Sequence, residues 1–321
     1  MFKIFFLFLI SCVIGNLNAQ QYPWLTQYRS NLYMFNPGFC GTKRVIDFRI
    51  FYRNQWTGFE GAPKTYAASF NARYFKGKLG TGAYVFQDNI GPFQTTNASL
   101  TFAFHLKFDD IEMSVGVQGN YLAQNFDGTK VTLHNQIDRG INQYVGANSN
   151  CFDGSAGIVL YNDRFFFSFG AINLIGNEMV YYKTDPNHHG RYKNEVAYSL
   201  GAGFNYAENK DFIFENSIMA LYTAGVPFYF DYTLRLHIRN KFFGGFSFRP
   251  GDAIALHLGI TVQNALQIGY SYDITTSPLA AYVGGTHEIK LIFSSNAGTD
   301  NKHKHGINNK FLKQKFQYLI N

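Results

Sequence analysis

The residues that could carry out chemistry are few and scattered. Gly154-Ser155-Ala156-Gly157 lacks the first glycine of a hydrolase nucleophile elbow, so we interpret it as small residues in a strand. His188 and His189 follow Asp185, but a metal site needs further ligands in a fixed geometry. Asp109-Asp110 is typical of an exposed turn, which does not shift carboxyl pKa values for acid–base catalysis. The sequence therefore predicts a protein that is not an enzyme, with no catalytic, cofactor-binding or metal site.

A second set of charged residues alternates with apolar ones. In 230–239, Phe230, Tyr232 and Leu234 oppose Asp231 and Arg235. Buried charges are tolerated when they are paired. Two interpretations stay open: a mutually neutralising network that plugs the interior of a barrel, or a charged conduit for solutes. The members of this set are Asp47, Arg49, Arg53, Glu112, Asp231, Arg235 and Arg239.

Alternation with period two predicts the elements that position these charges. Aromatic residues make up 18% of the chain and charged residues 15%, against about 25% charged in a typical soluble domain. Many alternating segments reach the roughly 9–11 residues that a tilted strand needs to cross a bilayer. The pattern predicts an all-β protein, a transmembrane antiparallel β-barrel of about 14 strands, with an irregular N-terminal leader and a basic C-terminal tail.

The predicted strands are joined by tight turns at one end and by longer connections at the other, as in outer-membrane barrels. Tight turns are expected at Asp109-Asp110 and Asn162-Asp163, and the longest loops at 125–150 and 175–194. The predicted strands are 45–54, 64–75, 78–87, 94–108, 111–124, 151–161, 165–174, 195–207, 211–222, 227–239, 242–249, 253–262, 266–274 and 281–293.

The chain divides into four parts. Residues 1–19 read as a signal peptide, with Lys3 before an apolar run; Cys12 offers a competing lipoprotein signal. Residues 20–44 form a periplasmic leader that packs below or inside the barrel of 45–293, and 294–321 form a basic periplasmic tail. Export without a spanning helix leaves a secreted, periplasmic or outer-membrane protein, and the strand pattern favours the outer membrane of a Gram-negative cell. Cys40 and Cys151 are expected to be free thiols.

The stretch YRNQWTGFEGAPKTYAASF, residues 52–70, is a strand–loop–strand signal with two glycines, a tryptophan and a phenylalanine in the loop. Together with FNPGFCG at 35–41, QDNIGP at 87–92 and GTHEIKLIF at 285–293, it resembles the PorP/SprF family of outer-membrane proteins of the Bacteroidetes. The chain departs from the family at Gly38-Phe39-Cys40, where Ala-Tyr-Ala is usual, and in its lysine-rich tail.

This resemblance implies a role in type IX protein secretion and gliding motility. Expected partners are a secreted cell-surface protein or adhesin, periplasmic secretion-ring components and outer-membrane lipid; nucleic acid is not expected. The alternative function is a passive outer-membrane channel for small solutes. The candidate partner-contact residues are Arg53, Asn54, Gln55, Trp56, Gly58, Phe59, Glu60, Gly61 and Pro63, and the leader motif is Asn36, Pro37 and Gly41.

Overall fold

The structure is a computed structural model that describes residues 22–43, 45–74, 77–131, 147–181, 190–207, 211–239, 241–263 and 265–295. The predicted signal peptide, the tail beyond Ser295 and the histidines at 188, 189, 303 and 305 lie outside the described residues. In the described part, no helix is long and apolar enough to span a membrane.

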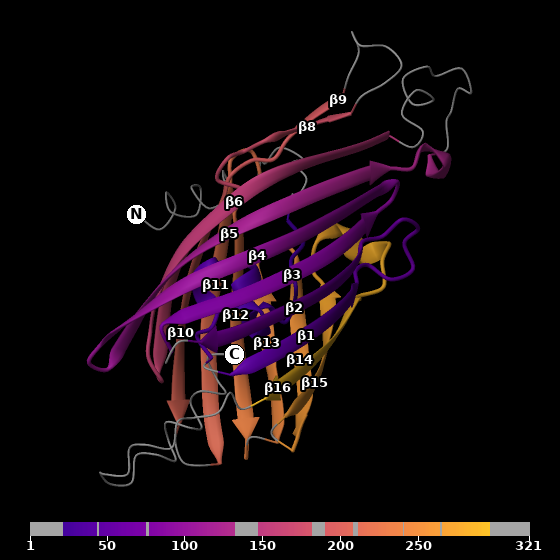
Figure 1. The fold of residues 1–321 in the computed structure, drawn as a ribbon. Helices are drawn as coiled ribbons and strands as arrows, with labels where there is room; N and C mark the ends of the chain where they lie inside the picture. Colours follow the sequence, from indigo (N-terminus) through magenta and orange to yellow (C-terminus); the bar gives the residue numbers. More distant parts are fainter. Residues whose placement is uncertain are drawn as a thin grey trace, which may run out of the picture.

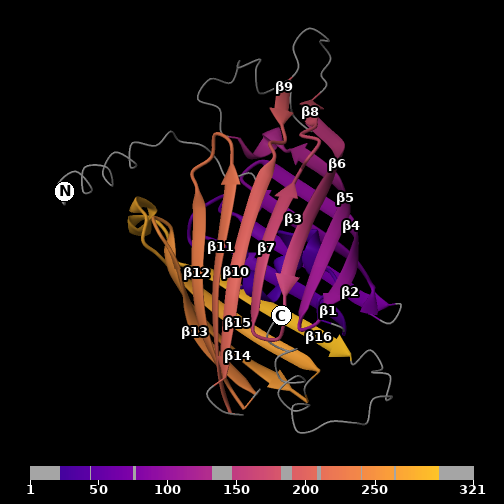
Figure 2. The ribbon, with the colours of Figure 1, turned by 90° about the vertical axis from the view of Figure 1, so that its left-hand side faces the viewer.

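Within the described residues, fourteen antiparallel strands form a closed barrel, in which β1 pairs with β16 (Figures 1 and 2). Each strand otherwise pairs with its neighbours in sequence, apart from a two-stranded hairpin, β8–β9, that stands outside the wall. The wall strands are β1 Ile46–Asn54, β2 Lys64–Tyr74, β3 Leu79–Ile90, β4 Phe93–Phe108, β5 Ile111–Phe126, β6 Ala147–Tyr161, β7 Phe165–Ile172, β10 Ala197–Ala207, β11 Phe212–Thr223, β12 Tyr229–Ile238, β13 Phe242–Arg249, β14 Ala253–Val262, β15 Leu266–Thr275 and β16 Thr286–Ser295.

Alternation produces two opposite faces on every strand. On β14, Leu258 points outward and is 64% exposed, while its neighbour His257 points inward and is fully buried. Outward side chains form an apolar surface suited to lipid, and inward side chains are mostly polar or charged. The prediction of a 14-stranded transmembrane barrel is confirmed.

The largest differences from the sequence prediction are two strand starts and the content of one loop. β6 begins at Ala147 rather than at 151, and β16 begins at Thr286 rather than at 281 because a short 3₁₀ helix, η6 (Pro278–Ala281), precedes it. The loop predicted at 175–194 contains the hairpin of β8 (Glu178–Tyr181) and β9 (Gly190–Lys193). Strands of four residues are too short to show a recognisable alternation of apolar and polar residues in the sequence.

The two ends of the barrel differ. At the short-turn end, connections such as 109–110 and 162–164 contain two to four residues. At the long-loop end they reach the 24 residues of 173–196, and the hairpin and the extended ends of β4, β5 and β6 project there (Figure 1).

The leader lies inside the barrel. Its three 3₁₀ turns, η1 (Tyr28–Ser30), η2 (Leu32–Met34) and η3 (Pro37–Phe39), are fully buried among inward-facing wall residues. Tyr22 borders a cavity between the 224–228 and 250–252 connections at the long-loop end. Lys43 approaches Asp47 at the start of β1, which is the short-turn end. The leader therefore passes along the length of the lumen.

Candidate functional site: the filled lumen and the rim loop

Buried charged side chains of the wall hold the leader near the long-loop end through hydrogen bonds. The Glu288 carboxylate on β16 accepts hydrogen bonds from the backbone N–H groups of Thr26 (2.7 Å) and Gln27 (2.8 Å). Arg53 on β1 lies 3.4 Å from Glu288 and 3.1 Å from Asp273, and it also contacts the Thr26 hydroxyl. The two strands that close the barrel are thus joined to each other through the leader.

A second cluster surrounds Glu215 on β11. Its carboxylate lies 2.7 Å from Arg29 of the leader, 3.0 Å from the His237 ring and 3.9 Å from Arg235. Arg29 also stacks over the Phe166 ring at 4.8 Å. One wall carboxylate therefore compensates a leader guanidinium that is completely buried.

Near the short-turn end, two further networks of charged side chains lie in the lumen. Asp47 pairs with Arg49 at 2.7 Å. Beginning on the next strand, β2, Arg73 donates to Glu112 of β5 at 2.7 Å, and the Tyr161 hydroxyl donates to the same carboxylate at 2.8 Å.

The inward charges balance. Within the described residues, eight acidic and eight basic side chains point into the lumen and are screened from solvent. The geometry matches the neutralising network anticipated from the sequence, except at Arg239. That residue belongs to the turn after β12, is 74% exposed and faces Asp211 at 4.0 Å, because the strand ends at Ile238. The sixteen are Arg29, Lys43, Arg49, Arg53, Arg73, Arg235, Arg249, Lys290, Asp47, Asp88, Glu112, Asp153, Glu215, Asp231, Asp273 and Glu288.

The leader motif sits against glycines of the wall. The Asn36 side chain accepts a hydrogen bond from Gly38 N–H (2.8 Å) and donates to the Ile158 carbonyl (3.3 Å). A methyl group on Gly157 would overlap the Asn36 side chain, and one on Gly116 would overlap Pro37. Gly41 has a φ of +76°, which a side chain would strain, and it lies against Gly80. We call Gly80, Gly82, Gly116, Gly157 and Gly170 the glycine seat; all five lie beside residues of 33–41.

Cys40 is sealed within this contact. Its backbone carbonyl lies 3.0 Å from His105 Nε2, and its sulfur faces Gly82. Burial keeps the Cys40 thiol away from solvent and from reagents. Cys40 and Cys151 are both free thiols.

The candidate partner-contact residues split between the lumen and the rim. Arg53 belongs to the buried network, whereas Gly58, Phe59, Glu60 and Gly61 are exposed at the long-loop end. Gln55 N–H donates to the Pro63 carbonyl (2.9 Å) and closes the loop. The structure thus does not bring all nine residues to one surface; Asn54, Trp56 and Pro63 are half-buried between them.

The rim loop 55–63 is fixed on both sides by backbone hydrogen bonds. Thr57 exchanges bonds with the 284–285 segment, donating to Gly285 (3.0 Å) and accepting from Gly284 (2.7 Å). On its other side, Gly91 N–H donates to the Gly61 carbonyl (2.8 Å). Three separate family-like sequence segments therefore meet at one place on the rim.

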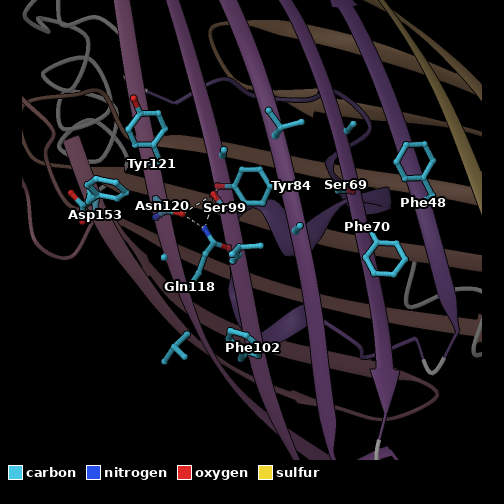
Figure 3. Close-up of a pocket in the computed structure, with 18 residues that line it drawn as sticks. Phe48, Ser69, Phe70, Tyr84, Ser99, Phe102, Gln118, Asn120, Tyr121 and Asp153 are labelled. Atoms are coloured by element: carbon cyan, nitrogen blue, oxygen red, sulfur yellow. Dashed lines mark hydrogen bonds between the residues drawn. The ribbon is translucent and has the colours of Figure 1, made fainter. Parts of the chain in front are cut away.

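A depression of about 980 Å³ lies on the wall formed by β1–β6 (Figure 3). Phe70, Phe102 and Tyr121 border it on the lipid-facing surface. Behind it, Gln118 donates to Tyr84 (3.2 Å) and Asn120 (2.6 Å) in the polar lining of the lumen. It collects no charged group except Asp153, and we interpret it as an uneven part of the lipid-facing surface.

No catalytic arrangement emerges from the described residues. Ser155 lies in the middle of β6, where its hydroxyl accepts from Asn120 (2.8 Å). The search for three or more histidine, cysteine or acidic side chains that could share a metal ion finds none in this part of the chain.

Comparisons with known proteins complete the description. The family model described as "Type IX secretion system membrane protein PorP/SprF" matches residues 17–293. No curated protein sequence matches. Among solved structures, the chain is similar to the Pseudomonas putida toluene transporter TodX, with 9% identity, a TM-score of 0.47, and 89% of this chain and 97% of that one covered. It is also similar to the Acinetobacter baumannii protein Omp33, with 9% identity, a TM-score of 0.42, and coverages of 79% and 100%. Neither structural likeness bears on function.

Proposed function

The chain belongs to the PorP/SprF family of type IX secretion system membrane proteins, and from this premise we propose a specific role. The protein is a non-enzymatic outer-membrane barrel that assists the export or surface anchoring of sorting-domain proteins such as adhesins. Its long-loop end faces the cell exterior and its short-turn end faces the periplasm, as the unequal connections support.

The filled lumen is the observation that carries this proposal. Leader residues 22–43 occupy the interior from end to end. Buried ion pairs fix them to β1 and β11, and hydrogen bonds to the carboxylates of Asp273 and Glu288 fix them to β15 and β16. A barrel occupied in this way acts through its surfaces rather than by letting molecules diffuse through it. The rim loop 55–63 is the proposed contact for the exported protein, and the short turns and the tail face the secretion ring.

Deleting the gene and complementing it tests the role. We expect cells without the protein to lose sorting-domain proteins from their surface, measured by mass spectrometry of peptides that protease releases from intact cells. Complementation by a Trp56→Ala, Glu60→Gln double variant should fail, because this variant changes the rim loop. Tyr282→Ala is the matched control, since Tyr282 is 77% exposed on the neighbouring loop. A deletion strain with unchanged surface proteins contradicts the proposal.

Ion conductance distinguishes this role from the passive channel. The filled lumen supports an absence of steady conductance when the purified protein is inserted into planar bilayers. Sustained conductance of the unmodified protein would favour the channel and would argue against the proposal.

A further inference from the structure

β6 has an edge that no strand of the described chain covers. β5 pairs with β6 along 147–161, but β7 pairs only with 156–161. The preceding nine residues, 147–155, therefore lack a strand on the β7 side. Figure 1 shows β4, β5 and β6 continuing together toward the long-loop end, and Figure 2 shows β6 reaching past β7 beside the hairpin.

The hydrogen bonds identify which backbone groups face this edge. Leu174 N–H donates to the Gly154 carbonyl (2.7 Å), and the Asn177 amide donates to the Phe152 carbonyl. Because backbone groups alternate in direction along an antiparallel strand, the N–H and C=O groups of Asn148 and Asn150 face the same side. Within the described part of the chain, no hydrogen bond joins them on that side.

This edge lies beyond the apolar band of the barrel. Phe152, which is 69% exposed, is the last large apolar residue on the outward face of β6 before the exposed side chains of Asn150 and Asn148. Residues 147–151 of this edge include neither a charged residue nor a proline, which proteins commonly use to protect exposed edges. It therefore offers unpaired backbone groups in water.

The edge is also held rigid. β5 pairs with every residue of it, from Ala147 to Cys151. Met179 of β8 is buried against Leu122 and Cys151, so the hairpin supports the extension from its inward side. A rigid strand with unpaired backbone groups is preorganised to bind another strand, because β6 itself loses little conformational entropy when the second strand binds.

We propose that residues 147–151 of β6 bind an extended segment of the exported protein as an added β-strand. This inference rests on the proposed function, which places a polypeptide partner at the long-loop end. Main-chain hydrogen bonds supply the affinity in this mode of recognition. The edge has the length of about one ordinary strand, and a strip of that size is too small for a stable contact between two barrels, which needs roughly 1,000 Å².

A proline at the edge tests the inference. Asn150→Pro removes an N–H group that faces the edge and leaves the pairing of β6 with β5 unchanged, because proline is tolerated where the N–H faces away from the sheet. Asn150→Thr is the control, since it changes the same side chain and keeps the N–H group. We expect Asn150→Pro to lower surface display of sorting-domain proteins by about tenfold relative to Asn150→Thr, as expected for the loss of one or two hydrogen bonds. Unchanged migration of the unheated barrel in gel electrophoresis shows that the variant is folded.

The outcomes separate the inference from the proposed function. If the deletion strain loses display while Asn150→Pro and Asn150→Thr both restore it, the inference is wrong and the proposed function stands. If the deletion strain retains display, both fail. If Asn150→Pro converts a dimer to a monomer in native mass spectrometry without changing display, the edge binds a second copy and the inference is overturned.

Discussion

At the scale of single residues, the wall glycines matter more than their small size suggests. Gly116 and Gly157 occupy inward positions at which other strands place polar or charged side chains. They allow the backbone of 36–38 to touch the wall, so the Asn36 amide reaches the Ile158 carbonyl. The leader motif and the glycine seat are therefore two halves of one contact.

Gly157→Ala should loosen that contact. The added methyl group overlaps the Asn36 side chain, and overpacking of this kind costs about 1–3 kcal/mol. In a Cys151→Ser background, we expect a maleimide reagent to label the buried Cys40 thiol at least about tenfold faster, because Cys40 moves with the motif. Gly119→Ala is the matched control, since nothing lies within 4 Å of its added methyl group. Equal labelling of the two variants would show that the seat does not position the leader.

Much of the residue pattern could be predicted from the sequence. Alternation identified Asp47, Arg49, Arg53 and Asp231 as inward-facing, because period two depends only on local geometry. It could not identify Glu215 as the centre of a cluster, since Arg29 reaches it only through the folded leader and Arg235 only through the pairing of β11 with β12. Lys290 was missed for the same reason, although it alternates with apolar residues on β16.

At the scale of elements, the strands were predictable and the non-strand segments were not. Predicted and observed strands agree closely because each wall strand carries its own apolar face. The leader has no period, and its aromatic residues pack in irregular turns, so sequence reasoning left open whether it lies below or inside the barrel. The β8–β9 hairpin depends on Asp153, which lies about 20 to 40 residues away in sequence from the segments it binds.

Asp153→Ala should release the hairpin while the barrel stays closed. The Asp153 carboxylate accepts from the N–H groups of Gly154 (2.7 Å) and Ile175 (2.9 Å) and from the Asn194 amide (3.4 Å). Losing these bonds leaves buried donors unpaired, at about 1–3 kcal/mol each. We expect trypsin to cleave faster at the exposed residue Lys193, measured by mass spectrometry of the fragments.

Glu178→Ala is the control for this experiment, since Glu178 pairs only loosely with exposed Arg191, at 3.7 Å. Cleavage rates that rise equally in both variants would mean that Asp153 does not anchor the hairpin.

At the scale of the whole molecule, the distribution of polar and apolar side chains is the reverse of that in a soluble protein. Its apolar surface is outside, and its interior holds equal numbers of described acidic and basic side chains around the leader, most of them in ion pairs. The apolar surface needs lipid, whereas the interior needs each charge to keep its partner.

Leu258→Arg tests the outward surface. Leu258 is near the middle of β14, so a charge there should make folding into a bilayer less favourable by about 2–4 kcal/mol. Leu279→Arg is the control, because Leu279 belongs to η6 at the rim. Urea titration of folding into liposomes measures both. A similar small effect of the two substitutions would contradict the assignment of this face to lipid.

The contact between Glu288 and the leader has a consequence for biogenesis. Thr26 and Gln27 precede their carboxylate partner by 262 and 261 residues, so these N–H groups have no protein acceptor until the last strand has been delivered. The same strand completes the wall by pairing with β1. Closure of the barrel and fixation of the leader inside it therefore occur in a single late step. A chain interrupted before β16 would lack both the seam and the anchor, and quality-control proteases would encounter an open sheet with an unbound leader.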